Sequence, residues 1–322
     1  MKISFVTTVF NEGKEINTFL DSLTAQTKKP DEINIVDGGS TDSTVSKIKE
    51  WKNKNRKLRI KLLIRNGTTI AQGRNEAIKE ATGEIIAMAD AGCIIHPDWL
   101  EKITEPFTNS RVDIVAGFYR MTGESVFQKC LASYLGITPQ KLNPENFMPS
   151  ARSMAFRKKV WEEIGGFNEN LERAGEDTLF NYQAKKLGFS FQMAKDALVD
   201  WKVPASWKEA IKKFYYYAKG DGQIGVWWHP SQRVSTHNLK ISAIYGRYFL
   251  VLTFLIFGFS FKILWLVLLV SFIFYLIWAI RKNYQFVKIK QAIFLLPMMQ
   301  IISDLAVMFG FFSGIINRVN KK

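Results

Sequence analysis

Short apolar runs that end abruptly in a polar, glycine-containing turn occur three times in the N-terminal part of the chain. The runs with their turns are Lys2–Thr7 before Phe10–Gly13, Ile33–Val36 before Asp37–Ser40, and Glu84–Ala89 before Asp90–Gly92. In an open parallel sheet, ligands bind just beyond the carboxyl ends of the strands. The turns therefore predict a ligand site, where Gly38 and Gly39 let the backbone approach closely and Ser40 or Thr41 caps the next helix.

Segments typical of strands alternate with charged, helix-like segments up to about Ile241. The predicted strands are Ile3–Thr7, Glu32–Val36, Leu58–Ile64, Glu84–Ala89 and Val112–Ala116. This alternation predicts an α/β domain with a doubly wound, mostly parallel sheet. Neither a GxGxxG nor a GxxxxGK[ST] motif follows any of these strands, which disfavours a dinucleotide site or a phosphate-binding P-loop.

Long apolar runs dominate the chain after Ile241, and they predict transmembrane helices over residues 241–259, 263–280 and 292–316. Together they exceed what one helix needs to cross a hydrocarbon core about 30 Å thick. A buried helical hairpin in a soluble protein is the alternative. The predicted organisation is a soluble domain over residues 1–228 and a membrane segment over residues 229–322. Asp304 is the single carboxylate of the third run, so we expect it to face a protein interior or a polar cavity.

The basic residues between the second and third spans set the expected orientation. They are Arg281, Lys282, Lys288 and Lys290. By the positive-inside rule this loop and the N-terminal domain both face the cytoplasm. We therefore expect a multi-pass protein of the cytoplasmic membrane, with its soluble domain in the cytoplasm and no cleavable signal peptide. Three crossings would place the basic residues at Arg318, Lys321 and Lys322 outside, so a re-entrant third segment broken at Pro297 stays open.

The formal net charge of +15 raises the question of nucleic acid binding. No helix-turn-helix, RNP-type or zinc-finger pattern accompanies the charge. An anionic membrane surface together with an anionic substrate explains the basic character better. We expect membrane lipids as partners and no nucleic acid.

Five short motifs, in their order along the chain, resemble those of the family 2 glycosyltransferases. They are Val6–Glu12, Val36–Thr44, Gly73–Asn75, Asp90–Gly92 and Gly175–Asp177. The resemblance covers roughly Met1 to Gly225. It implies the Rossmann-like GT-A fold and the transfer of a sugar from a nucleotide-sugar donor, usually with inversion.

The same resemblance implies which residues hold the donor. They are Thr8, Phe10, Asn11, Glu12, Asp37, Gly39, Arg74, Asn75, Asp90 and Ala91. The first turn and Asp37 would hold the nucleoside, although a carboxylate at this position can also simply cap a turn. Arg74 could pair with the diphosphate because guanidinium suits phosphate oxygens, or be a surface arginine.

A Mg²⁺ or Mn²⁺ ion at Asp90 is also implied by the resemblance. Such ions are commonly held by one or two carboxylates together with substrate phosphates. The sequence departs here from the usual Asp-x-Asp, because Gly92 replaces the second carboxylate.

Glu176 and Asp177 open a predicted helix that runs through Leu187. The resemblance makes Asp177 the general base, which would remove the proton of an acceptor hydroxyl. Glu176 could help to raise the pKa of that base. The alternative is that both carboxylates only stabilise the positive end of the helix dipole.

An amphipathic helix is predicted at about residues 206–219. Apolar residues such as Trp207 and Phe214 share one face, and the other side carries Lys208, Lys212, Lys213 and Lys219. This pattern is typical of a helix at the membrane interface, where Trp207 and the lysines would meet a lipid-linked acceptor; packing on the soluble domain is the alternative. The Gln-x-x-Arg-Trp motif of processive polysaccharide synthases is replaced by Tyr215–Gly220, which indicates a non-processive enzyme.

The leading hypothesis is a membrane-anchored enzyme that transfers one sugar to a hydroxyl of a polyprenyl-diphosphate-linked saccharide. This layout resembles transferases of exopolysaccharide and surface-glycan assembly. One alternative is a polyprenyl-phosphate glycosyltransferase, whose phosphate acceptor is already ionised near neutral pH and needs no base. The other is a catalytically silent membrane scaffold, which only Gly92 favours.

Overall fold

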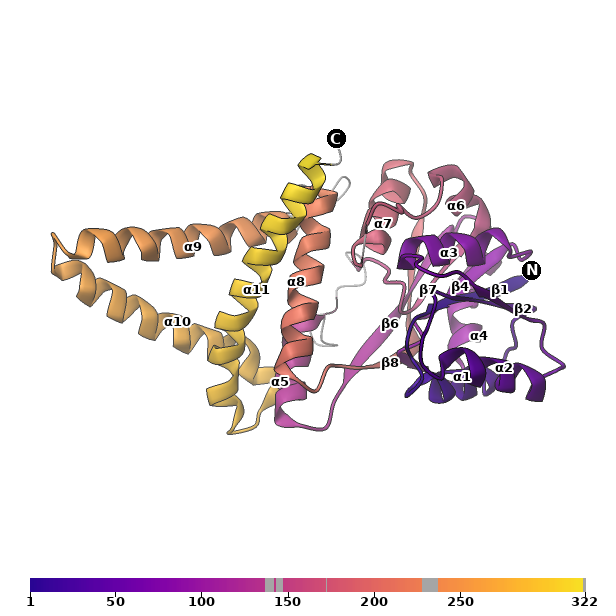
Figure 1. Ribbon diagram of the computed structural model, residues 1–322. Helices are drawn as coiled ribbons and strands as arrows, with labels where there is room; N and C mark the ends of the chain where they lie inside the picture. The colour runs from indigo at the N-terminus through magenta and orange to yellow at the C-terminus, as the bar shows by residue number, and fades with distance from the viewer. Residues whose placement is uncertain (137–141, 143–146, 172, 228–236, 321–322) are drawn as a thin grey trace. The chain divides into compact units, whose positions relative to one another are not determined.

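The computed structural model describes residues 1–136, 142, 147–171, 173–227 and 237–320 (Figure 1). The chain divides into two compact units. The first, here the sheet unit, contains Met1–Met121 and Lys141–Lys202; the second, here the helical unit, contains Thr122–Gln140 and Val203–Lys322. Two helices that precede residue 228, α5 (Val126–Leu135) and α8 (Trp207–Ile224), belong to the helical unit and contact its C-terminal helices.

The sheet unit is built on one sheet of eight strands in the order β3-β2-β1-β4-β7-β6-β8-β5. The strands are β1 (Ile3–Val9), β2 (Glu32–Asp37), β3 (Ile60–Ile64), β4 (Ile85–Met88), β5 (Cys93–Ile95), β6 (Ile114–Thr122), β7 (Met154–Arg157) and β8 (Phe191–Lys202). The helices of this unit are α1 (Ile16–Thr24), α2 (Thr44–Lys54), α3 (Ile70–Lys79), α4 (Trp99–Thr104), the 3-10 helix η1 (Glu105–Thr108), α6 (Lys158–Ile164) and α7 (Glu176–Lys186).

Strands β1 to β4 form the parallel half of the sheet, as the sequence predicted. Strand β1 lies between β2 and β4, with Val9 opposite Asp37 and Val6 opposite Met88. Strands β1, β2 and β4 are almost entirely buried, which is why each reads as a continuous apolar run. The register brings the turns after these strands to one edge of the sheet.

The other half of the sheet contains antiparallel pairs. Strand β7 pairs antiparallel with both β4 and β6, and β5 pairs antiparallel with β8. The sequence did not predict β5, β7 or β8. Strands β5 and β7 are too short to show a pattern, and β8 carries four charged residues.

Aromatic packing joins α7 to the sheet. The rings of Phe167 and Phe180 stack with centroids 4.6 Å apart, and Phe180 also contacts Phe156 of β7 at 5.2 Å. All three side chains are buried. This contact fixes the start of α7, where Glu176 and Asp177 lie, relative to the sheet.

The helical unit contains α5 (Val126–Leu135), α8 (Trp207–Ile224), α9 (His237–Gly258), α10 (Ile263–Val287) and α11 (Ala292–Asn320). The three predicted spans each form a helix. By length and composition, Asn238–Gly258, Ile263–Val287 and Ala292–Asn320 can cross a membrane. They differ in burial, because 39% of the apolar window of α11 is buried inside the protein, against 11% for α9 and 6% for α10.

Helices α8 and α11 lie side by side (Figure 1) and touch through their backbones. A Cβ atom at Gly310 would lie 2.1 Å from the carbonyl oxygen of Tyr215, and one at Gly314 would lie 2.2 Å from that of Lys219. Small residues four apart allow such close helix packing in membrane proteins. The apolar residues Phe214 and Ala218 of α8 are buried in this unit. Ala218 packs on Phe311 of α11, and the ring of Phe214 lies against that of Tyr134 in α5, so the apolar face of α8 packs within the helical unit.

Candidate active site

Asp37, at the end of β2, organises the turn that follows it. Its side chain is fully buried and accepts hydrogen bonds from the backbone N–H of Gly39 (3.0 Å), the N–H of Ser40 (2.9 Å) and the hydroxyl of Ser40. Gly39 has a φ of +96°, a conformation that favours glycine. Asp37 thus has the turn-forming function that was one of its two predicted roles.

The turn after β1 is tied to the turn after β2. Asn11 donates its N–H to the hydroxyl of Ser40, and its Oδ1 accepts from the N–H of Thr41, both at 2.8 Å. Ser40 and Thr41 therefore do not cap the next helix as expected; α2 begins at Thr44, whose hydroxyl accepts from the N–H of Glu12 at 2.8 Å.

One aromatic side chain beside these turns is exposed to solvent. Phe10 is 58% exposed. Its ring lies close to Gly38, because a Cβ atom added to that glycine would be 3.6 Å from the ring. Thr8 lies beneath α3, because a Cβ atom at Gly73 would come within 2.7 Å of its methyl group. The structure thus gathers most of the predicted nucleoside-binding residues at one edge of the sheet. An exposed ring next to backbone N–H groups can stack on a base.

Arg74 joins three motifs that are distant in the sequence. It comes from the first turns of α3, is 4% exposed, and donates to the carboxylate of Glu176 at the start of α7. Its other terminal nitrogen donates to Oδ1 of Asp90, in the turn after β4, at 2.8 Å. Arg74 is therefore a buried arginine that bonds two carboxylates, and it is not a surface arginine.

Burial and the neighbouring charges shift the pKa values of Arg74 and Glu176 in this cluster. Burial alone would lower the pKa of Arg74, but the carboxylates of Glu176, Asp90 and Asp177 outweigh it and raise that pKa. Burial raises the pKa of Glu176, the nearby charge of Asp177 adds to the effect, and Arg74 offsets part of it. One guanidinium thus faces three carboxylates.

Asp177 is half-buried and held in place by the segment before β7. Its Oδ2 accepts from the N–H of Ala151 (3.1 Å) and the hydroxyl of Ser150 (3.4 Å). Arg152 donates to the same hydroxyl at 3.0 Å. The carboxylate is oriented by these neighbours and stays partly open to solvent.

The side chain of Asn75 is hydrogen-bonded to α6 and to the loop that follows it. Its Oδ1 accepts from the indole N–H of Trp161 (2.9 Å) and the N–H of Phe167 (2.8 Å). Its amide group donates to the carbonyl of Phe167 and to Glu169, both at 2.8 Å. This predicted donor-binding residue thus uses its side chain to fix the loop that leads to α7.

The residues around Asp90 fit a divalent ion shared with a diphosphate. The Asp90 side chain is 38% exposed, Ala91 is buried, and a Cβ atom at Gly92 would meet nothing within 4 Å. Among the described residues, no group of three or more His, Cys, Asp or Glu side chains forms a metal cage. One carboxylate suffices for Mg²⁺ when substrate phosphates complete the shell.

Arg152, Tyr119 and Trp201 form a cluster that the sequence did not reveal. The guanidinium of Arg152 lies 5.1 Å from the ring centroid of Tyr119 and 4.4 Å from that of Trp201. Through Ser150 this cluster reaches Asp177. Its members come from β6, β8 and the segment before β7, so no short sequence pattern could predict the cluster.

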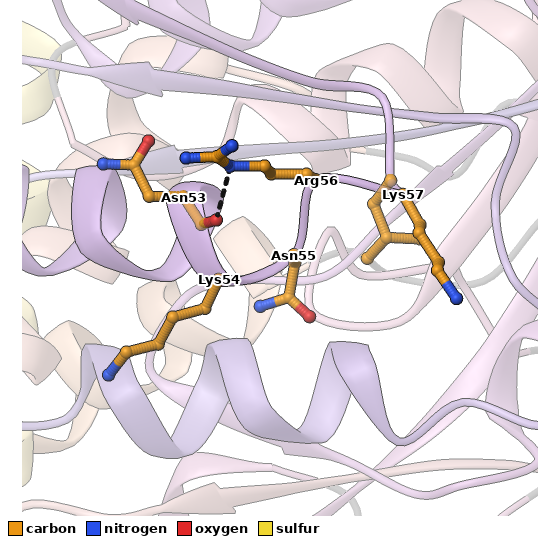
Figure 2. A pocket seen from close by; sticks show the side chains of 6 residues that line it. Asn53, Lys54, Asn55, Arg56 and Lys57 are labelled. Carbon is orange, nitrogen blue, oxygen red and sulfur yellow. Dashed lines mark hydrogen bonds between the residues drawn. The ribbon is translucent and has the colours of Figure 1, made fainter.

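Two pockets lie at the opposite edge of the sheet. One, of about 300 Å³, is bordered by Asn53–Leu58, just before β3 (Figure 2), where Arg56 donates to the backbone oxygen of Asn53. The other, of about 500 Å³, is bordered by Thr82–Glu84 before β4, by Ser110 and by the basic stretch Arg157–Lys159. Neither contains a predicted site residue, so we do not identify them with the active site.

The predicted interface residues all lie on α8, in the helical unit. The ring of Trp207 packs on that of Phe127 from α5, with centroids 4.8 Å apart. Lys208 and Lys212 are exposed, and Lys213 lies over the ring of Tyr217 at 5.8 Å. Lys219 is partly buried.

Family models place this fold and this set of motifs in a known family. The model described as "Glycosyl transferase family 2" matches residues 4–165, and "Glycosyl transferase family group 2" matches residues 85–283. The chain therefore belongs to the family 2 glycosyltransferases.

Individual relatives agree with this assignment. Glycosyltransferase AglE of Haloferax volcanii is 26% identical over 70% of this chain and 74% of its own length. A Methanococcus voltae protein is 24% identical over 98% of this chain and 97% of its own; it is named as a dolichyl N-acetyl-alpha-D-glucosaminyl phosphate 3-beta-D-2,3-diacetamido-2,3-dideoxy-beta-D-glucuronosyltransferase. The fold matches the mannosyltransferase PcManGT of Pyrobaculum calidifontis, solved with GDP-Man and Mn²⁺, with a TM-score of 0.56 and 21% identity over 69% of this chain and 62% of that one.

Proposed function

We propose that this glycosyltransferase moves one sugar from a nucleotide-sugar donor to a hydroxyl group of a saccharide linked through phosphate to a polyprenyl lipid. The observation that carries the proposal is the placement of Asp177. This half-open carboxylate is fixed by the N–H of Ala151 and lies in the charge field of the cluster around Arg74 and Asp90.

Asp177 is the general base of the proposed reaction. It accepts the proton of the acceptor hydroxyl while that oxygen attacks the anomeric carbon of the donor sugar. The bond between the anomeric carbon and the diphosphate breaks on the opposite face, so the configuration inverts. Glu176 is a second carboxylate beside this base. Because it is buried and paired with Arg74, it does not compete with Asp177 for the acceptor hydroxyl.

The donor occupies the edge formed by the turns after β1, β2 and β4. The nucleoside meets Phe10, Asn11 and the backbone around Asp37 and Gly39. Asp90 faces the diphosphate and would share a divalent ion with it. When bound, that ion offsets the negative charge on the departing nucleoside diphosphate.

The acceptor class is supported by the helical unit and by one relative. Three helices can cross a membrane, and the Methanococcus relative that matches nearly the whole chain is named for a dolichyl-linked acceptor. The basic loop between α10 and α11 supports a cytoplasmic orientation of the enzyme. The exposed Lys208 and Lys212 of α8 would then approach the anionic lipid surface.

The test is a transfer assay with the purified full-length protein, a panel of nucleotide sugars and a membrane lipid extract. We expect one labelled lipid product that is released by mild acid and carries more than one sugar. A labelled product with a single sugar on a lipid monophosphate would instead identify a polyprenyl-phosphate glycosyltransferase. Donor binding without any transfer or hydrolysis would contradict both.

A further inference from the structure

The helical unit contains a polar cluster inside otherwise apolar helices. Asp304 of α11 is 1% exposed and accepts hydrogen bonds from Arg247 of α9, from the hydroxyl of Tyr275 in α10 (2.6 Å) and from Gln300 one turn earlier (2.8 Å). This confirms the expectation that Asp304 faces the protein interior. Lys282 of α10 extends the cluster by donating to Gln300 at 3.3 Å.

Arg247 has more hydrogen-bonding capacity than Asp304 uses. One terminal nitrogen bonds Asp304, while its Nε is buried and has no partner among the described residues. The side chain is 33% exposed. The ring centroids of Tyr275 and Trp278 lie 4.8 and 5.7 Å from the guanidinium carbon. Buried donors are rarely left unpaired, so a further acceptor is expected here.

The arrangement of α9, α10 and α11 sets where this cluster lies. Helices α9 and α10 meet at the turn Gly258–Ile263 and diverge toward α11, which crosses between their far ends (Figure 1). The start of α9 contacts the second half of α11, where Tyr245 donates to the carbonyl of Met308. The end of α10 contacts the first half, through Lys282 and Gln300. The three helices thus form a triangle with α11 as its base.

A triangle of this kind favours one orientation in a bilayer. The tip is strongly apolar and exposed, with Phe257, Phe259 and Phe261 each more than half exposed. The base is the more buried helix and is flanked by the basic residues that follow α10. If the tip enters the hydrocarbon, α11 lies along the membrane surface, and Arg318 in its last turn stays on the same side as the loop before it. The polar cluster then lies at the depth of lipid headgroups.

We propose that Arg247, assisted by Lys282, binds the phosphate group of a membrane lipid whose hydrocarbon chain runs along the α9–α10 hairpin. Guanidinium groups bind phosphate oxygens through paired N–H donors, and Asp304 keeps Arg247 oriented when the lipid is absent. This inference deepens the proposed function, because the phosphate of a lipid-linked acceptor has the required chemistry. A bulk anionic phospholipid has it too.

The test measures lipid binding to the purified full-length protein by native mass spectrometry. The probes are a long-chain polyprenyl monophosphate, the matching polyprenol without phosphate, and phosphatidylglycerol. Arg247→Gln should weaken binding of the polyprenyl phosphate by about 10-fold or more, and Lys282→Gln by a smaller factor. Lys262→Gln, an exposed cation at the tip of the hairpin, is the matched control and should bind as the wild type does.

Asp304→Asn separates a phosphate site from a purely structural cluster. If Arg247 binds phosphate, loss of the competing carboxylate should strengthen binding. If the cluster only joins helices, the same change should weaken or not affect binding, and that result overturns the proposal. Unchanged binding by folded Arg247→Gln, or equal binding of the polyprenol, overturns it as well. Should Arg247→Gln not fold, the Asp304→Asn measurement decides.

Competition between the two phosphate lipids identifies the source of the phosphate. Preference for the polyprenyl phosphate indicates the acceptor, and equal competition indicates bulk lipid; both support the phosphate site. The active-site variant Asp177→Asn should bind lipid as the wild type does. Lipid binding without any transfer activity in the wild type would therefore contradict the proposed function alone.

Discussion

Each unit contains an arginine paired with a buried carboxylate, but the two clusters differ in their balance of charge. In the sheet unit, Arg74 faces the carboxylates of Glu176, Asp90 and Asp177. In the helical unit, Arg247 and Lys282 share a cluster with Asp304. Among the described residues, carboxylates outnumber cations around Arg74, whereas Arg247 and Lys282 outnumber the single carboxylate of Asp304. The proposed ligands differ accordingly: a proton and a divalent ion for the first cluster, and a phosphate group for the second.

The difference shows that a buried ion pair does not by itself define a function. The neighbours that complete the charge balance decide what each cluster can bind. Arg74 is almost fully buried and both of its partners are carboxylates, whereas Arg247 is one-third exposed among aromatic rings. We therefore expect substitutions in the two clusters to affect different measurements.

The largest expected effect is on turnover. Asp177→Asn should lower the transfer rate by about 10²- to 10⁴-fold, the usual contribution of a positioned base, while donor binding stays near normal. Steady-state kinetics and donor titration measure the two quantities. Glu163→Gln, an exposed carboxylate on α6, is the control. Wild-type turnover in Asp177→Asn would show that Asp177 is not the general base. The contrast drawn between the two clusters would then lose its catalytic side.

Breaking the buried pair should cost stability as well as activity. Arg74→Met leaves the Glu176 carboxylate buried without its partner, which typically destabilises a protein by about 3–5 kcal/mol. The double variant Arg74→Met, Glu176→Met should recover much of that loss in denaturant unfolding but regain no transfer activity. Equal stability of Arg74→Met and the wild type would mean that Arg74 does not hold Glu176 in solution.

Removal of the partly exposed Asp90 carboxylate should mainly weaken binding of the donor. Asp90→Ala should weaken metal-dependent donor binding by about 10- to 100-fold, the range typical of changes close to a bound metal. Calorimetric titration of the nucleoside diphosphate with and without Mg²⁺ or Mn²⁺ measures the effect. If a chelator leaves wild-type donor binding unchanged, the metal assignment of Asp90 is wrong.

The smallest predicted effect tests the packing that holds the helical unit together. Gly314→Ala forces a methyl group against the backbone of α8 and should destabilise this unit by about 1–3 kcal/mol, the usual result of overpacking. Gly246→Ala on α9 is the control, because its added Cβ atom would meet nothing within 4 Å. Thermal unfolding in detergent compares the two variants, and similar melting temperatures would contradict the close contact of α8 with α11.

The sequence predicted those parts of the fold that depend on local patterns. Each parallel strand is a continuous apolar run that ends in a polar turn, so the strands and the shared edge of their turns could be predicted. Asp304 stood out because a lone carboxylate within an apolar run requires a buried partner.

Features that depend on long-range pairing were not predicted. The short strands β5 and β7 become strands only because β8 and β4 lie beside them. The burial of Arg74 depends on Glu176, about a hundred positions away in the sequence, and the contact of Arg152 with Asp177 passes through Ser150. Similarly, the amphipathic pattern of α8 shows that one face is apolar but does not identify α11 as the partner that covers it.

The division of the chain has a practical consequence for dissecting the protein. The helical unit is discontinuous, because Thr122–Gln140 belongs to it while Lys141–Lys202 returns to the sheet unit. A single cut before the apolar segment would leave α5 and α8 attached to the sheet unit, with the apolar face of α8 uncovered and prone to aggregate. A soluble fragment for crystallisation or screening should therefore end near Lys202 and replace Thr122–Gln140 by a short polar linker.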